Sequence, residues 1–141
     1  MKDKDFNYTR TIKFKAKRLD NGEWVEGYYL EDKNNVDSIF DGNTFIKVDP
    51  STVCQFTGRK DNDGKEIWEG DIIYIVLAYV LSGEVIYDKE RGSFVVVPDE
   101  ESSKYYERNM SFIEIEEMSS IEESVEMEVL YSKFDRKGGE K

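Results

Sequence analysis

Gln55-Phe-Thr-Gly-Arg-Lys-Asp61-Asn-Asp-Gly-Lys-Glu66-Ile-Trp-Glu-Gly-Asp71-Ile72 is the stretch that decides the fold of this chain. Phe56 ends one extended run, and Thr57-Gly58 interrupts it. A polar turn over residues 61–64 follows, and Ile67-Trp68 then lead through Glu69-Gly70-Asp71 into an apolar run. This order of strand formers and turn formers predicts extended segments joined by a tight turn and a glycine bend.

Strand signals also precede this stretch. Residues 11–17 alternate, with Ile12, Phe14 and Ala16 on one face and polar side chains on the other. Asn21-Gly22 favours a hairpin to residues 23–30, because both residues tolerate positive φ. A turn at Asp41-Gly42 precedes a strand over residues 44–48, which Pro50 ends because it removes a ladder donor. Antiparallel pairing of the first two strands is therefore expected, and a third pairing should follow.

The later segments extend the pattern. Residues 72–81 form an apolar run that predicts one strand buried on both faces or covered by another subunit. Residues 83–87 and 93–97 flank a charged hairpin loop, and residues 112–116 and 125–129 alternate apolar with acidic side chains, which is a strand period. Residues 120–123 contain the pattern of a helix capping box, and residues 102–109 are a weaker helical candidate.

Composition sets the fold class. The chain has 141 residues, 38% hydrophobic and 36% charged, which suits one soluble domain. Its aromatic content of 13% favours packing across strands. We therefore predict an all-β fold with one or two short helices: a small antiparallel β-barrel of SH3-like type with additional C-terminal strands. Residues 1–9 should form a flexible lead, residues 10–132 a single β domain and residues 133–141 a disordered tail.

The stretch from Gln55 to Ile72 resembles the hallmark of the YopX family, small proteins of phages and prophages of low-GC Gram-positive bacteria. An opening Ile12-Lys-Phe14-Lys-Ala16 and the segments 83–87 and 92–95 are similar to other family strands, so the resemblance covers roughly residues 10–97. Beyond residue 98 the chain departs from the family pattern. The resemblance implies a YopX-like β fold and a phage or prophage setting, and it transfers no catalytic residue. The hallmark positions, expected to shape turns and strands, are Gln55, Thr57, Gly58, Asp61, Gly64, Glu66, Ile67, Glu69, Gly70 and Asp71.

Several function classes are disfavoured by composition. The chain has no histidine and one cysteine, Cys54, which excludes Ser-His and Cys-His nucleophile systems and the commonest zinc sites. The aspartates and asparagine of residues 61–66 lack the ligand spacing of an EF-hand. Its N-terminus lacks the apolar core of a signal peptide, and residues 72–81 are too few to span a bilayer as a helix, which needs about 20 residues. We expect a cytoplasmic protein of the bacterial host that is not an enzyme and needs no cofactor or metal.

Charge is unevenly placed along the chain, whose net charge is -11. Residues 1–18 hold seven Lys or Arg and two Asp or Glu, whereas residues 99–128 hold eleven Asp or Glu and two Lys or Arg. Opposite charge at the two ends could pair two segments of one molecule or two subunits, or mark two solvated faces that never meet. Together with the apolar run 72–81, the asymmetry predicts a homo-oligomer.

Two function classes remain. The first is a protein-interaction module for a host or phage protein, whose glutamate-rich face could imitate nucleic-acid phosphates. Its candidate surface is Trp68, Tyr79, Glu114, Glu116, Glu126 and Glu128. The second is a single-stranded nucleic-acid binder, which the acidic balance disfavours. It would use a basic strand beside stacking aromatic rings, namely Lys13, Lys15, Lys17 and Arg18 with Trp24, Trp68, Tyr74 and Tyr79.

Overall fold

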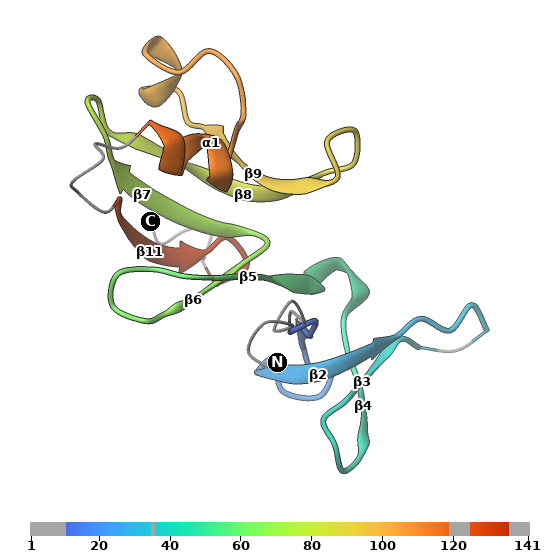
Figure 1. The fold of residues 1–141 in the computed structure, drawn as a ribbon. Helices are drawn as coiled ribbons and strands as arrows, with labels where there is room; N and C mark the ends of the chain where they lie inside the picture. The colour runs from blue at the N-terminus through green and yellow to red at the C-terminus, as the bar shows by residue number, and fades with distance from the viewer. Residues whose placement is uncertain (1–10, 35, 119–124, 136–141) are drawn as a thin grey trace, which may run out of the picture. The chain divides into compact units, whose positions relative to one another are not determined.

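The computed structural model describes residues 11–34, 36–118 and 125–135. The chain divides into two compact units, residues 1–58 and 59–141, where the sequence predicted one domain over residues 10–132 (Figure 1). Gly58, the last residue of the first unit, has a φ of +88°, a conformation that residues with a side chain rarely adopt.

The first unit is an antiparallel sheet. Its strands lie in the order β4-β3-β2-β1-β5, and β5 continues across the boundary into the second unit. The strands are β1 (Phe14–Lys17), β2 (Trp24–Leu30), β3 (Ser38–Phe40), β4 (Phe45–Lys47) and β5 (Cys54–Lys60), with a 3-10 turn, η2 (Pro50–Thr52), before β5.

The predicted Asn21-Gly22 hairpin between β1 and β2 is confirmed. Gly22 has a φ of +77°, and the Arg18 N–H donates to the Glu23 carbonyl at 2.8 Å. Alternation along β1 places Ala16 in a small core with Ile39 of β3. The Pro50 stop and the pairing of β3 with β4 across Asp41-Gly42 are also as expected.

The second unit holds a five-stranded antiparallel sheet of order β10-β9-β8-β7-β11. Its buried core gathers aliphatic side chains of β7, β8 and β9 under one short helix. The elements are β6 (Glu66–Trp68), β7 (Asp71–Val76), β8 (Leu81–Asp88), β9 (Ser93–Pro98), η3 (Ser102–Lys104), β10 (Met110–Ser111), α1 (Phe112–Glu117) and β11 (Glu126–Ser132).

The prediction of one strand over residues 72–81 is wrong, because this run forms β7, a turn and the start of β8. Ile73 and Ile75 are buried while Tyr74 and Val76 are exposed, so the strand has one core face rather than two. A residue far along the chain stabilises this turn, because the Tyr79 N–H donates to the Tyr106 hydroxyl at 3.3 Å. A run of apolar residues does not reveal such a turn.

The prediction of a strand over residues 112–116 is also wrong, because these residues form α1. Ser111 caps the helix: its side chain accepts from the Glu114 N–H at 3.1 Å, and the Glu114 carboxylate accepts from the Ser111 N–H at 2.9 Å. Phe112 and Ile115 are buried on one face. The candidate 102–109 contains the short η3, whereas the candidate 120–123 lies outside the described residues.

The all-β class with one short helix is confirmed. The described strands form two antiparallel sheets, and no closed barrel is found among them. The first residues of the predicted tail are tied to the sheet, because the Lys133 N–H donates to the Gly70 carbonyl at 2.9 Å. Residues 1–9 and 136–141, the lead and the rest of the tail, lie outside the described residues.

Candidate functional site: an acidic groove beside the hallmark turn

The hallmark turn is organised around a buried carboxylate. Asp61 is only 7% exposed and accepts three backbone hydrogen bonds. Its Oδ1 accepts from the N–H groups of Asp63 and Lys65 at 2.9 Å each, which closes the turn. Its Oδ2 accepts from the N–H of Val129 at 3.0 Å, which joins the turn to β11. One side chain thus shapes the turn and fixes it to a strand 68 residues further along the chain.

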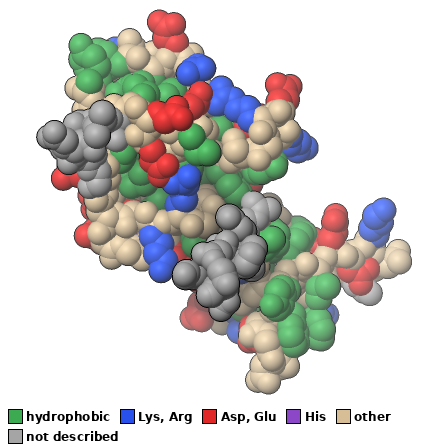
Figure 2. All heavy atoms as spheres, viewed as in Figure 1, with side chains coloured by type: hydrophobic (Ala, Val, Ile, Leu, Met, Phe, Trp, Pro, Cys, Tyr) green, Lys and Arg blue, Asp and Glu red, His purple; other side chains and the backbone are tan. Residues whose placement is uncertain are grey.

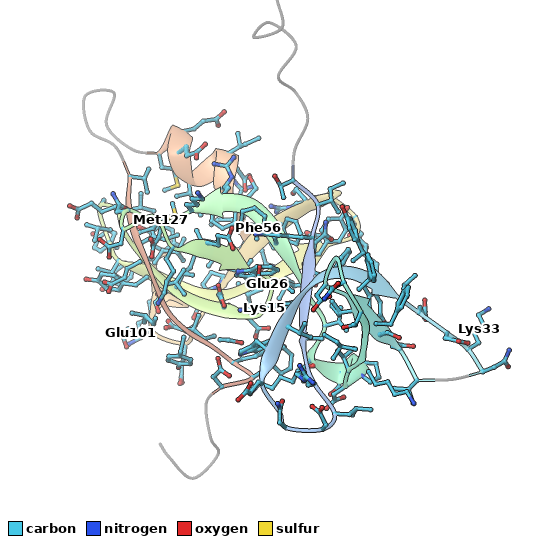
Figure 3. All side chains as sticks on the ribbon, turned by 90° about the horizontal axis from the view of Figure 1, so that it is seen from below. Lys15, Glu26, Lys33, Phe56, Glu101 and Met127 are labelled. Atoms are coloured by element: carbon cyan, nitrogen blue, oxygen red, sulfur yellow. The ribbon has the colours of Figure 1, made fainter. Side chains whose placement is uncertain are left out.

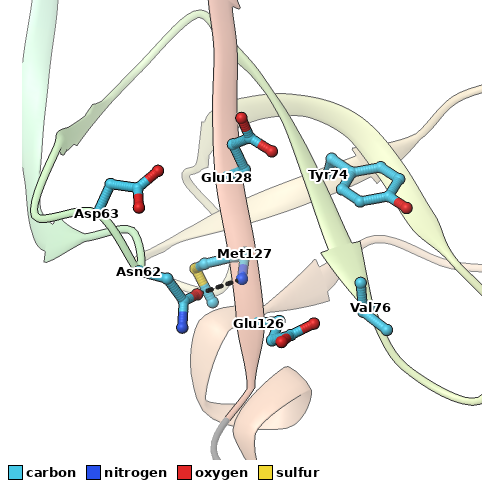
Figure 4. A pocket seen from close by; sticks show the side chains of 7 residues that line it. All are labelled: Asn62, Asp63, Tyr74, Val76, Glu126, Met127 and Glu128. Carbon is cyan, nitrogen blue, oxygen red and sulfur yellow. Dashed lines mark hydrogen bonds between the residues drawn. The ribbon is translucent and has the colours of Figure 1, made fainter.

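Asn62 extends this attachment along β11. Its N–H donates to the Met127 carbonyl at 3.1 Å, and its side-chain oxygen accepts from the Met127 N–H (Figure 4). β11 pairs with β7 on its other side. The turn therefore covers the backbone of what would otherwise be an open sheet edge, and such edges are prone to pair with other chains.

The pKa of Asp61 reflects this environment. Burial raises the pKa of the carboxyl group, but the three backbone N–H donors, first that of Val129, lower it by more. The pKa of Asp61 accordingly lies below its ordinary value, so the group is ionised at neutral pH.

The second part of the hallmark is a tight corner between β6 and β7. Asp71 is buried and its carboxylate accepts from the Trp68 N–H at 2.8 Å. Gly70 has a φ of +88°, and its N–H donates to the Val85 carbonyl at 2.8 Å. This corner ties the hallmark to β8, as the first turn ties it to β11.

The other hallmark positions support these two turns. Ile67 is fully buried in the core of the second unit, and Gly64 has a φ of +82°, which the turn requires. The remaining positions lie on strands or at the corner and are at least partly exposed, namely Gln55, Thr57 and Gly58 on β5, Glu66 on β6, and Glu69 before Gly70.

An open groove of about 210 Å³ lies on the solvent-facing side of β7 and β11, next to the hallmark turn (Figure 4). The pairing register brings Glu126 opposite Val76 and Glu128 opposite Tyr74, so these four side chains share one face of the sheet. The acidic groove is lined by Asn62, Asp63, Tyr74, Val76, Glu126, Met127 and Glu128.

The acidic groove combines negative charge with apolar surface. Tyr74 and Val76 are 38% and 40% exposed, and the carboxylates of Asp63, Glu126 and Glu128 line the same groove. Within the described part of the chain, no Lys or Arg forms an ion pair with these three carboxylates. A lysine or arginine side chain suits such a site, because its alkyl stem packs on an apolar surface while its charge meets carboxylates.

Comparison with known proteins identifies the family. The chain matches the family model described as YopX protein over residues 2–123, which is most of its length. The chain belongs to the YopX family. The match extends past residue 98, so the family covers more of the chain than the residues 10–97 that the resemblance suggested. This YopX chain matches no curated protein and no solved structure.

The predicted glutamate face of this YopX protein is divided between two elements. Glu126 and Glu128 lie on β11 in the acidic groove, whereas Glu114 and Glu116 lie on α1. Arginines engage both helical residues: Arg91 and Arg108 contact Glu114 at 3.2 Å each, and Arg59 pairs with Glu116. The hydrogen bond from the Ser111 backbone, followed by these positive charges, lowers the pKa of Glu114.

The two aromatic candidates have opposite environments. Trp68 is 4% exposed and packs in the interior, which removes it from a contact surface of this chain. Tyr79 is 55% exposed and stacks on Tyr105, with ring centroids 4.0 Å apart. The structure does not bring Tyr79 together with the acidic groove, whose lining residues do not include it.

Sequence reasoning missed Asn62, Asp63, Val76 and Met127 as groove residues. Asp63 was interpreted only as part of a polar turn, and Val76 as part of a buried strand. A signal was present in the alternation of residues 125–129 and of the first half of 72–81. The pairing of these two strands, which creates the groove, joins residues that are fifty or more positions apart in the chain.

No helix among the described residues has the length and apolar character needed to cross a membrane. In the same residues, no group of three or more Cys, Asp or Glu side chains is placed to hold a metal ion.

Proposed function

We propose that this YopX protein is a non-enzymatic interaction module, and that its acidic groove binds a basic segment of a partner protein. The observation that carries the proposal is the acidic groove itself: the carboxylates of Asp63, Glu126 and Glu128, which pair with no Lys or Arg among the described residues, line it together with Tyr74 and Val76. Apolar surface of this kind beside one sign of charge is typical of a contact site, because the charge selects the partner and the apolar part contributes burial.

The carboxylates that would imitate nucleic-acid phosphates in this proposal are those of β11 and the hallmark turn. Alternate residues of a strand are about 6.6 Å apart, which suits Glu126 and Glu128 to the spacing of a phosphate row. The helical glutamates are less suited, because arginines of the same unit already neutralise them. The partner should accordingly present lysines or arginines with one or two apolar residues between them.

The biological setting belongs to the same proposal. The phage and prophage setting implied by the family resemblance makes a bacterial host protein or a phage protein the expected partner, in the cytoplasm. The absence of histidine from the chain supports a role without acid-base or nucleophilic catalysis.

Self-association stays a prediction, but the structural feature that supports it differs from the one expected from the sequence. The apolar run that motivated it is a hairpin, and its exposed large hydrophobic side chains are Tyr74, Val76, Tyr79 and Val80, at 38%, 40%, 55% and 41%. Sedimentation velocity at micromolar concentrations should show a species heavier than the 16.5 kDa monomer. A monomer at all concentrations would contradict it.

NMR titration with a short peptide of alternating lysine and leucine tests the acidic groove directly. Amide shifts should move at residues 62–63, 74–76 and 126–128. The triple variant Asp63→Asn, Glu126→Gln, Glu128→Gln should abolish these shifts. The control Glu100→Gln, Glu107→Gln, Glu117→Gln removes the same charge from exposed positions outside the groove and should retain them. Equal responses of the two variants would refute a groove-specific site.

A further inference from the structure

The first unit exposes a row of aromatic rings that its own core does not use. Tyr28 of β2 pairs with Phe40 of β3, and Phe40 pairs with Phe45 of β4, so the three rings share one face of the sheet. Tyr28 and Phe45 are 67% and 65% exposed, and the Phe40 and Phe45 ring centroids are 4.8 Å apart. Hydrophobic side chains gather over β3 and β4 in Figure 2.

The core lies on the opposite face of this sheet. Tyr29, Ile39 and Ile46 form the neighbouring cross-strand row, and Ile39 is fully buried. Leu30, two residues after Tyr28 and on the aromatic face, is 44% exposed. These exposed side chains are not part of the core of the unit, and clustered exposed apolar side chains are typical of interaction sites.

Lysines border the aromatic row. Lys15 and Lys17 of β1 pair with Glu26 and Trp24, which places them on the same face as Tyr28. Figure 3 shows Lys15 beside Glu26 on the neighbouring strand. The Lys15 and Lys17 Nζ atoms lie 4.4 and 5.2 Å from the centre of the Trp24 ring, which holds both side chains against the sheet.

The remaining charges of this face also favour an anionic ligand. Lys13 pairs with Glu26 at 3.6 Å, and Glu26 is the acidic residue of β1 and β2 on this face. On the other side of the row, Lys47 follows Phe45 by two residues along β4 and shares its face. The four lysines on this face thus outnumber the acidic residues on the same strands.

The acidic character of the chain resides in the other unit. Residues 59–141 contain 21 Asp or Glu and 11 Lys or Arg, whereas residues 1–58 contain 10 and 9. Most of the net charge of -11 therefore lies in the second unit, and the first unit repels an anion less than the net charge of the whole chain suggests.

We propose that the aromatic face of the first unit, Tyr28, Phe40 and Phe45 bordered by Lys13, Lys15, Lys17 and Lys47, binds single-stranded nucleic acid. Bases stack on the exposed rings, and the lysines contact the backbone phosphates. Rings on three adjacent strands, about 4.8 Å apart, offer successive stacking positions without selecting a particular base. This site is separate from the acidic groove and goes beyond the proposed protein-interaction function.

Fluorescence anisotropy with a labelled oligothymidine tests the proposal on the full chain. Four lysine-phosphate contacts predict about a 50-fold loss of affinity between 50 and 200 mM salt. Phe45→Ala should weaken binding at least about fivefold, since it removes one stacking ring. Tyr105→Ala, which removes an exposed ring in the second unit, should leave binding unchanged. Lys47→Gln should weaken binding and reduce the salt dependence, whereas the exposed control Lys104→Gln should do neither.

Three outcomes would overturn the proposal. The first is absence of binding at 50 mM salt, and the second is equal affinity of wild type and Phe45→Ala. The third is equal affinity for a duplex of the same length, because paired bases cannot stack on the rings. A dimer that Phe45→Ala dissociates, without nucleic-acid binding, would assign this face to a second copy of the chain instead. None of these outcomes bears on the acidic groove, so the two proposals fail independently.

Discussion

Replacing Asp61 by Asn tests the inference that the hallmark turn is attached to β11 through one carboxylate. The Asn side-chain oxygen still accepts from the two turn N–H groups, but its amide group faces the Val129 N–H, so that two donors meet. Val129 is 7% exposed, and water cannot readily replace the lost acceptor. A buried unsatisfied donor costs about 1 to 3 kcal/mol, and a hydrogen bond to a charged group is worth about 1.5 to 3 kcal/mol.

Because these two quantities describe the same lost contact, we expect a loss of about 2 to 3 kcal/mol in the free energy of unfolding of the second unit. Urea unfolding measures it through the emission of Trp68, which is buried in this unit. A Trp24→Phe background removes the signal from the first unit. The urea midpoint should fall by about 1 to 1.5 M, for a denaturant slope of about 2 kcal/mol/M.

Asp63→Asn is the matched control for this substitution. Asp63 lies in the same turn but its side chain is exposed, so we expect less than about 0.5 kcal/mol of change. If Asp61→Asn and Asp63→Asn shift the midpoint equally, the carboxylate does not hold the turn to β11, and the attachment must depend on Asn62 and the backbone alone.

Acid should destabilise the second unit: the folded pKa of Asp61 lies below its ordinary value near 3.8, so its contribution is complete above that value and is lost as the pH falls further. Urea titrations between pH 6 and pH 2.5 should show this loss in wild type and a smaller one in Asp61→Asn; parallel curves would contradict it. Ser111→Ala should cost about 1 kcal/mol through loss of the α1 cap, against less than about 0.5 kcal/mol for Ser103→Ala, whose hydroxyl makes an exposed hydrogen bond, in the same urea assay. Gly83→Ala should unfold the second unit or lower its thermal midpoint strongly, because the new Cβ would lie 1.9 Å from the Val97 carbonyl oxygen; a native midpoint would show that β8 and β9 can separate without penalty.

Local signals predicted the first hairpin and the hallmark turn well, because both depend on residues adjacent in sequence. Asn21-Gly22 and Asp61 to Gly64 dictate backbone geometry by their own conformational preferences. The buried role of Asp61 was less accessible, since its third hydrogen-bond partner is a backbone group of β11.

The secondary-structure predictions were wrong where a segment fits two patterns, or where a contact with a residue far along the chain determines its structure. Residues 112–116 satisfy a strand period, but Ser111 and Glu114 also form a capping box, and the helix prevailed because Phe112 and Ile115 then share one buried face. Residues 72–81 lack any turn former, and the turn at Tyr79 and Val80 is bonded to the distant Tyr106 and Ser102 hydroxyl groups, which the local sequence does not reveal.

The acidic groove was predicted in part. Glu126 and Glu128 were recognised from their alternation on a strand, and their chemistry from their charge. The position of Tyr74 and Val76 beside these glutamates could not be predicted, because it depends on the register of β7 against β11, which a single sequence does not specify. The division of the other glutamates onto α1 likewise depended on the helix that the strand period concealed.

Affinity capture from nuclease-treated host lysate tests the central claim most directly, when wild type is compared with the Asp63→Asn, Glu126→Gln, Glu128→Gln variant and with the Glu100→Gln, Glu107→Gln, Glu117→Gln control. We predict a discrete protein with a lysine- or arginine-rich segment that wild type and control retain and the groove variant loses. A partner retained equally by all three proteins, or no partner at all, would contradict the assignment of the acidic groove as an interaction site.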